Sequence, residues 1–128
     1  MTFLHKTLAS FSVAAALPFV FGCEGGGGSG PSASSATTEA NVSGTVTIAG
    51  KPADSGELVF DPSNINRKTA PTFKAAIGKD GSYSTKTLVG ENTVYLRGVA
   101  AEKNRDRGMF RKNVDVKAGD NPVNVEIP

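Results

Sequence analysis

The stretch Asn41-Val-Ser-Gly-Thr-Val-Thr-Ile48 decides the fold class of this chain. Its apolar residues, Val42, Val46 and Ile48, fall on one face of an extended segment, and its serine and threonine residues fall on the other. Such alternation with β-branched residues is typical of a strand that has one buried and one solvated face. Gly50-Lys-Pro52 then ends the pattern, so we predict a strand over 41–48.

The same alternation recurs toward the C-terminus, without a convincing helical period in any segment. Further apolar alternations occur at 58–60, 73–77, 83–88, 94–96, 114–116 and 123–127. Turn-forming residues separate them, and Asp80-Gly81 is the strongest short-range hairpin signal among these. Seven short strands predict an all-β domain over 41–128, a seven-stranded antiparallel β-sandwich.

Several of these turns and strands resemble the carboxypeptidase regulatory-like domain. The matching segments are Val42–Pro52, Leu58–Pro62, Lys79–Tyr83, Leu88–Gly90 and Val94. That family has a transthyretin-like seven-stranded β-sandwich, so the resemblance implies this fold here. The matching residues mark turns and core strands, and the family's domains are accessory or recognition modules. The resemblance therefore implies no catalytic residue.

Upstream of the domain, the first 22 residues read as an export signal. Lys6 precedes an apolar run over 7–21, which is shorter than the ~20 residues that a spanning helix needs. Pro18 would also disrupt a helix near the end of the run. We therefore expect a cleaved signal peptide over 1–22 rather than a permanent transmembrane segment.

The run ends in Val20-Phe-Gly-Cys23, which resembles the lipobox of bacterial lipoproteins. The resemblance implies that the Cys23 thiol receives a diacylglycerol and that the chain is cut before Cys23. Lipoproteins of Gram-negative bacteria with Asp after the cysteine stay in the inner membrane, so Glu24 favours the outer membrane. The alternative is an ordinary secretory signal beside a chance cysteine, which would leave a lone thiol on an exported protein.

Residues 24–40, EGGGGSGPSASSATTEA, contain no large apolar side chain. Burial of such a segment cannot offset the entropy lost on ordering it, so we expect a disordered tether over 23–40. The chain would then consist of a signal peptide (1–22), a lipidated cysteine with its tether (23–40) and a β-sandwich domain (41–128).

The composition argues against several classes of function. The formal charge of +2 gives no dense basic stripe, so we expect no nucleic-acid binding. The only histidine is His5, inside the leader, and the only cysteine is Cys23. The mature chain therefore has no histidine or thiol for a catalytic triad or a zinc site, and we expect no enzyme activity, metal or cofactor. For Asp61–Asn66 we expect a turn capped by its own side chains rather than a calcium loop.

One segment carries the positive excess. Residues 97–112 hold six basic and two acidic side chains, a net charge of +4. The candidate anion-binding residues are Arg97, Lys103, Arg105, Arg107, Arg111 and Lys112. The segment is either a solvated loop whose charges oppose strand-edge aggregation, or a loop that contacts an anionic partner with Met109-Phe110 as an apolar anchor. We expect structural roles for Tyr83 and Tyr95, the latter on a solvated face.

Together these features predict a membrane-anchored lipoprotein that serves as a non-catalytic structural or interaction module of the cell envelope. The alternative is a ligand-binding domain for an anionic envelope component through the basic segment. The expected partners are the membrane, through the anchor at Cys23, and an envelope protein or an anionic polymer.

Overall fold

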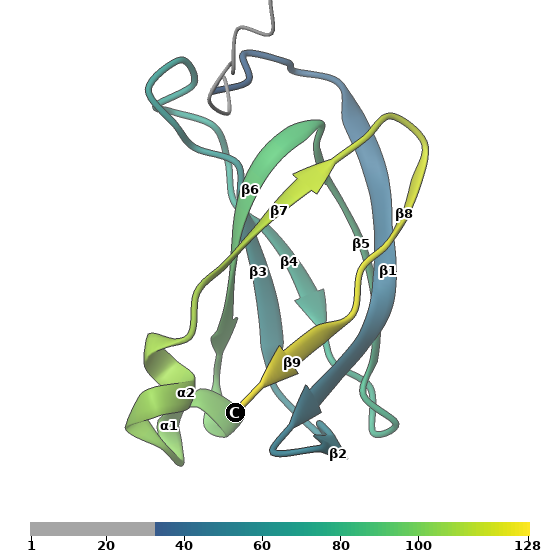
Figure 1. The fold of residues 1–128 in the computed structure, drawn as a ribbon, viewed down its shortest axis with the longest axis vertical. Coiled ribbons are helices and arrows are strands. Elements are labelled where there is room, and N and C mark those ends of the chain that lie inside the picture. Colours follow the sequence, from purple (N-terminus) through teal and green to yellow (C-terminus); the bar gives the residue numbers. More distant parts are fainter. Residues whose placement is uncertain (1–32) are drawn as a thin grey trace, which may run out of the picture.

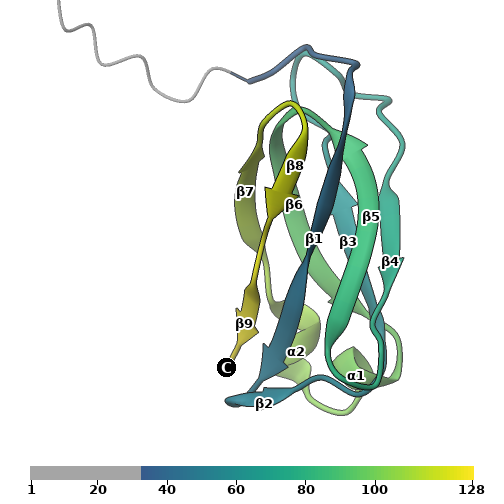
Figure 2. The same cartoon turned by 90° about the vertical axis from the view of Figure 1, so that its right-hand side faces the viewer.

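Two β-sheets pack face to face in the computed structural model, which describes residues 33–128 (Figure 1, Figure 2). The predicted all-β sandwich is confirmed. The strands are β1 (Glu39–Ile48), β2 (Lys51–Pro52), β3 (Glu57–Asp61), β4 (Phe73–Ala76), β5 (Ser82–Leu88), β6 (Gly90–Arg97), β7 (Lys112–Val116), β8 (Asp120–Pro122) and β9 (Val125–Ile127). Two short helices, α1 (Val99–Glu102) and α2 (Arg105–Met109), lie between β6 and β7.

The two sheets differ in how their strands pair. One has the antiparallel order β4-β3-β6-β7. In the other, β1 pairs antiparallel with β2 and β5 and parallel with β8 and β9. Nine strands over 33–128 replace the seven expected, because a two-residue β2 follows β1 and a three-residue β8 forms just before the expected last strand, which is β9.

The division between β8 and β9 arises where the chain crosses Gly44 of β1. A Cβ atom at Gly44 would lie 2.0 Å from the Val123 carbonyl oxygen, so only glycine permits this close approach. The Asn124 side-chain oxygen accepts hydrogen bonds from the Thr45 backbone N–H and hydroxyl, both at 3.1 Å. A side chain thus replaces the backbone acceptor at this point, and the parallel pairing resumes at Val125.

The inward faces of both sheets supply the core. Val42 and Val46 of β1 lie opposite Leu58 and Phe60 of β3, and each of these side chains is fully buried. The Phe60 ring lies 5.9 Å from the Tyr83 ring, measured between centroids. Val116 of β7, on the same side of the four-stranded sheet, is also fully buried.

The Asp80-Gly81 signal gives a turn, but its flanking strands lie in different sheets. The Gly78 N–H donates to the Ser82 carbonyl oxygen at 2.8 Å, and Gly81 has a φ of 82°. β4 pairs with β3, whereas β5 pairs with β1. The expected hairpin is therefore wrong, because the two strands that flank the turn do not pair with each other. The turn instead carries the chain from one sheet to the other, and the Gly81 carbonyl accepts a hydrogen bond from the Val46 N–H of β1.

The fold begins earlier than the sequence predicts. β1 starts at Glu39, and residues 33–38 run beside the β5–β6 turn, where the Val89 N–H donates to the Thr38 carbonyl at 2.9 Å. The expected disordered tether over 23–40 is thus wrong for residues 33–40, because the fold supplies hydrogen-bond partners for their backbone. Residues 1–32, with the predicted signal peptide and Cys23, lie outside the described residues.

Candidate functional site

The basic segment 97–112 forms two single-turn helices, where a loop was expected. The Asn104 side chain caps α2, since its oxygen accepts from the Asp106 N–H at 2.8 Å. Ala100 and Ala101 are the buried residues of α1, on its inner side. Helices of four and five residues are too short to produce a helical period, which is why the sequence pattern missed them.

The structure divides the six candidate cations among several places. Arg97 and Arg111 flank the Tyr95 ring, with their guanidinium carbons 5.5 and 4.5 Å from its centroid. Both distances are within the range of a cation–π contact. Tyr95 is half-buried on the outer face of the sheet, so its expected position on a solvated face is confirmed.

The other four cations point elsewhere. Lys103 and Arg107 line a separate hollow of about 210 Å³, which Asp54 also lines. The Lys112 ammonium donates to the Asn124 carbonyl at 3.1 Å, toward β9. Arg105 is exposed on α2. The six residues therefore do not form one cluster, and only the Arg97–Arg111 pair shares an aromatic surface.

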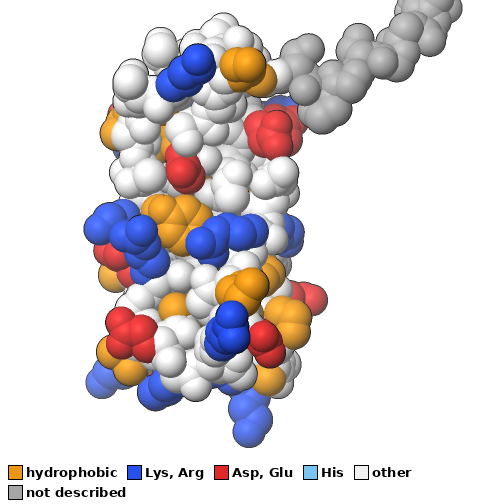
Figure 3. Space-filling model, turned by 90° about the vertical axis from the view of Figure 1, so that its left-hand side faces the viewer, with side chains coloured by type: hydrophobic (Ala, Val, Ile, Leu, Met, Phe, Trp, Pro, Cys, Tyr) orange, Lys and Arg blue, Asp and Glu red, His pale blue; other side chains and the backbone are white. Residues whose placement is uncertain are grey.

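Few of these charges are neutralised by contact. Within residues 33–128, the ion pairs are Lys74 with Glu57, at 3.6 Å, and Lys117 with Asp115. Neither involves a side chain of the basic segment. Figure 3 shows Lys and Arg side chains on both sides of a hydrophobic patch on the outer face of the four-stranded sheet.

The apolar pair within the segment is also divided. Met109 is 65% exposed at the end of α2. Phe110 is half-buried and packs against the core cluster. Val99, at the start of α1, is 58% exposed. The apolar surface near the cations thus comes from Val99 and Met109, rather than from Met109 and Phe110.

Tyr83 has a structural position, as expected. Its hydroxyl donates to the Val123 carbonyl at 2.6 Å, and the residue as a whole is 5% exposed. Burial raises the pKa of the Tyr83 phenol above its ordinary value, because the phenolate would lose its solvation. The side chain therefore stays neutral and joins β5 to the segment that links β8 and β9.

The polar loop after β3 forms the expected side-chain-capped turns. The Asp61 carboxylate accepts from the Ser63 N–H at 2.9 Å, and the Asn64 side-chain oxygen accepts from the Asn66 N–H at 2.8 Å. Within residues 33–128, no group of three or more Asp, Glu, His or Cys side chains is placed to hold a metal ion.

Arg67, in the same loop, is a buried residue that sequence reasoning missed. It is 9% exposed, and its Nε donates to the Pro62 carbonyl at 2.5 Å. Its Nη1 donates to the carbonyls of Ala36 and Val89, and its Nη2 to that of Glu91, each at 2.8 Å. Arg67 thus joins the segment before β1, the β3–β4 loop and the β5–β6 turn. An arginine in a polar loop reads as solvated, so the sequence held no signal for this role.

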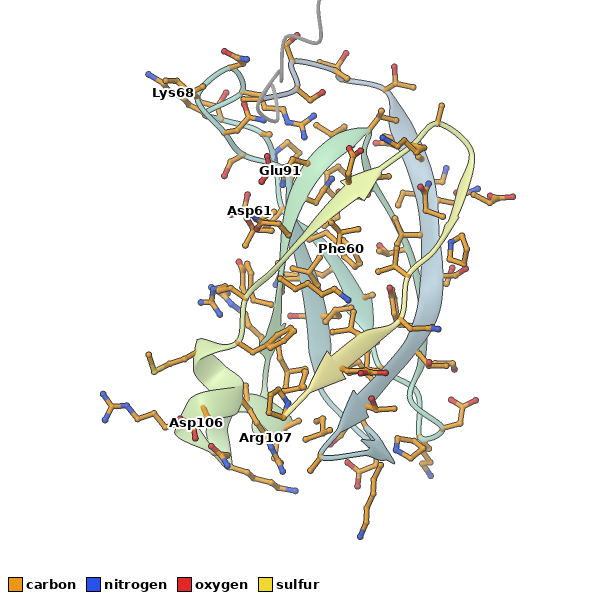
Figure 4. All side chains as sticks on the ribbon, in the orientation of Figure 1. Phe60, Asp61, Lys68, Glu91, Asp106 and Arg107 are labelled. Atoms are coloured by element: carbon orange, nitrogen blue, oxygen red, sulfur yellow. The ribbon has the colours of Figure 1, made fainter. Side chains whose placement is uncertain are left out.

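The described chain begins at one end of the sandwich, and the two short helices lie at the other. Figure 4 shows Lys68 at one end and Asp106 with Arg107 at the other. The described chain begins at the Lys68 end, while α1 and α2 form the opposite one (Figure 1). A larger hollow of about 910 Å³ lies beside residues 33–36, where Glu91 and Asp115 contribute carboxylates. The candidate anion-binding residues are therefore remote from the point where the chain enters the fold.

Comparisons with known proteins give structural neighbours only. No protein-family model matches the chain, and no curated protein matches it. Among solved structures, it is similar to a DUF3823 family protein from Parabacteroides merdae, with 18% identity, a TM-score of 0.48, and coverage of 69% of this chain and 45% of that one. A DUF3823 family protein from Bacteroides ovatus gives 16% identity, a TM-score of 0.46, and coverage of 70% and 43%. The chain spans less than half the length of either neighbour.

Within residues 33–128, no helix has the length and apolar character needed to cross a membrane.

Proposed function

We propose that this protein is an exported lipoprotein, anchored through Cys23, whose β-sandwich acts as a non-catalytic structural or interaction module of the cell envelope. The observation that carries the proposal is the position of the two ends of the sandwich relative to Cys23. The chain enters at the end held by Arg67, and nine residues, 24–32, separate that end from Cys23. Nine residues span at most ~30 Å when extended. An anchor at Cys23 therefore keeps this end near the membrane.

The opposite end is then presented away from the membrane. β1 has ten residues, which corresponds to a length of about 33 Å. α1 and α2 lie at that far end, level with β2 and the end of β1 (Figure 1). The turn and core residues over 42–97 support assignment of the domain to the carboxypeptidase regulatory-like class, and Glu24 favours the outer membrane. Both finer assignments belong to the proposal.

The first prediction concerns the anchor. We expect Cys23→Ser to move the protein from the membrane fraction to the soluble fraction, or to block removal of the leader. Stable anchoring needs two or more acyl chains, and serine has no thiol to receive the diacylglycerol. The measurement is fractionation of intact cells, with mass spectrometry of the mature N-terminus.

Ser29→Ala, in the same glycine-rich stretch, is the matched control and should leave the fractionation unchanged. An unmodified Cys23 thiol on the mature protein would refute lipidation and return the chain to the ordinary secretory class.

A second candidate function is binding of an anionic envelope component. The specific observation in its favour is that residues 97–112 carry a net charge of +4, and that no carboxylate within 33–128 forms an ion pair with them. Unpaired cations raise the local concentration of anions and speed their association, and this steering weakens with salt.

The second prediction tests this electrostatic contribution. The change is the triple variant Arg105→Gln, Arg107→Gln and Arg111→Gln, which leaves a segment charge of +1. Wild-type protein should bind polygalacturonate at low ionic strength, and the variant should bind it much more weakly. Arg105 is exposed, so its change should cost under about 0.5 kcal/mol of stability. Arg107 is half-buried and Arg111 lies over the Tyr95 ring, so circular dichroism must first show that the triple variant is folded. Equal binding by the two folded proteins would favour the purely structural role.

A further inference from the structure

The guanidinium groups of Arg97 and Arg111 lie over the Tyr95 ring, on the outer face of the four-stranded sheet. Arg111 donates through Nη1 to the carbonyls of Phe110 and Gly108, at 2.7 and 3.1 Å, while its guanidinium carbon lies 4.5 Å from the centroid of the Tyr95 ring. Stacking and two hydrogen bonds restrain the Arg111 side chain before any ligand binds, so less rotamer entropy is lost on binding. The Nε and Nη2 donors of Arg111 make no hydrogen bond within residues 33–128, so they are available to a ligand.

Arg97 is the second arginine beside the Tyr95 ring, and it lies on the same strand as Tyr95. It follows Tyr95 by two residues on β6, so both side chains leave the same face of the sheet. Its cross-strand neighbour is Glu57, yet the Glu57 carboxylate pairs with Lys74. Within the described residues, no carboxylate lies within 4.0 Å of the Arg97 guanidinium.

A groove opens beside these two arginines. It has a volume of about 360 Å³ and lies where β6 ends and the helices begin. Gly98 and Gly108 line it without side chains, which leaves room for a ligand to approach the backbone. Glu102 also lines the groove, so its charged residues are two cations and one anion.

We infer that this groove is an oxyanion-binding site, in which Arg97 and Arg111 donate to a carboxylate or phosphate group held beside the Tyr95 ring. The inference rests on the second candidate function and narrows it from six residues to two. Guanidinium groups match carboxylate and phosphate oxygens in a bidentate geometry, which ammonium groups cannot reproduce. The groove is open at the surface and, in the proposed orientation, lies at the end presented away from the anchoring membrane, so it suits an anionic group carried on an acidic polymer.

The test compares variants of equal charge in the full chain, purified in a neutral detergent. Arg97→Gln with Arg111→Gln removes both groove cations. Lys103→Gln with Arg105→Gln removes two exposed cations of the same segment that do not line the groove. Arg97→Lys with Arg111→Lys keeps the charge but removes the planar donors. Circular dichroism checks that each variant is folded.

The probes are immobilised polygalacturonate, for a carboxylate polymer, and mixed micelles containing phosphatidylglycerol, for a lipid phosphate. We expect the groove variant to lose about tenfold or more in affinity, which corresponds to the loss of a charge-assisted hydrogen bond. The lysine variant should lose several-fold, and the Lys103/Arg105 variant should stay within about threefold of wild type, as screened surface charges contribute little. Preference for polygalacturonate supports a polymer ligand, whereas preference for the lipid phosphate would contradict that assignment.

Two results would overturn the inference in different ways. If the two charge-equal variants lose the same affinity, binding is diffuse: the groove is then not the site, although the second candidate function stands. If wild-type protein binds neither probe at low salt, both the groove and the second candidate function are wrong.

Discussion

Replacing Phe60 with alanine is expected to lower the free energy of unfolding by about 3–5 kcal/mol, the range for a fully buried phenylalanine. Phe60 lies on β3, which is flanked on both sides in its sheet, and its side chain has no exposed surface. Its ring contacts the Tyr83 ring of the opposite sheet, with 5.9 Å between centroids. The loss therefore combines the transfer of apolar surface with a cavity between the two sheets.

Urea denaturation of a fragment over 33–128, followed by circular dichroism, measures this loss. Phe73→Ala is the matched control, since Phe73 pairs with Phe60 across β3 and β4 but is only half-buried on an edge strand. We expect the control to lose clearly less. Equal losses at the two positions would contradict the assignment of Phe60 to the centre of the core.

Replacing Arg67 with alanine is expected to cost about 2–4 kcal/mol, because it removes four charge-assisted hydrogen bonds and leaves carbonyls partly without partners. The acceptors belong to Ala36, Pro62, Val89 and Glu91. The effect should be local as well as global, since Arg67 joins the segment before β1 to the rest of the fold. Residues 33–38 should become sensitive to proteases at concentrations that leave the wild type intact.

The neighbouring Lys68→Ala is the control, because Lys68 is exposed and should change stability by less than about 0.5 kcal/mol. Arg67→Lys adds a second comparison: a lysine carries the charge but cannot direct donors along the three directions that the guanidinium uses. Full stability and protease resistance in Arg67→Lys would show that charge, and not the arrangement of donors, holds the segment.

Local periodicity was sufficient for most of the strands. The alternation around Val42 and Val46 predicts β1, and the apolar positions Leu58 and Phe60 predict the inward face of β3. Successive side chains of a strand point to opposite faces, so a strand with one buried face leaves this pattern in the local sequence. Partner choice depends on distant parts of the chain. Neither the parallel pairing of β1 with β8 and β9 nor the change of sheet at Asp80-Gly81 leaves a local pattern.

In the candidate site, too, some features follow from the local sequence and others depend on distant parts of the chain. Composition alone identifies the basic segment, and alternation predicts that Tyr95 faces outward. The approach of Arg111 to Tyr95 depends on the register between β6 and β7, in which Val94 pairs with Lys112. Arg67 gives no periodic or compositional signal, because its four acceptors are backbone carbonyls, which are present at every residue.

The parallel pairing of β1 with β8 and β9 sets the order in which the domain can fold. Asn41 and Asp120, joined by a side-chain hydrogen bond, are 79 residues apart in sequence. Pairings of such separation carry a large loop-closure entropy, and domains dominated by them fold in milliseconds to seconds rather than microseconds. During synthesis, β1 emerges long before residues 120–127, so one of its edges stays open until they arrive. An open strand edge invites pairing with other chains, which makes the closure of β8 and β9 onto β1 the step that protects the folding chain from aggregation.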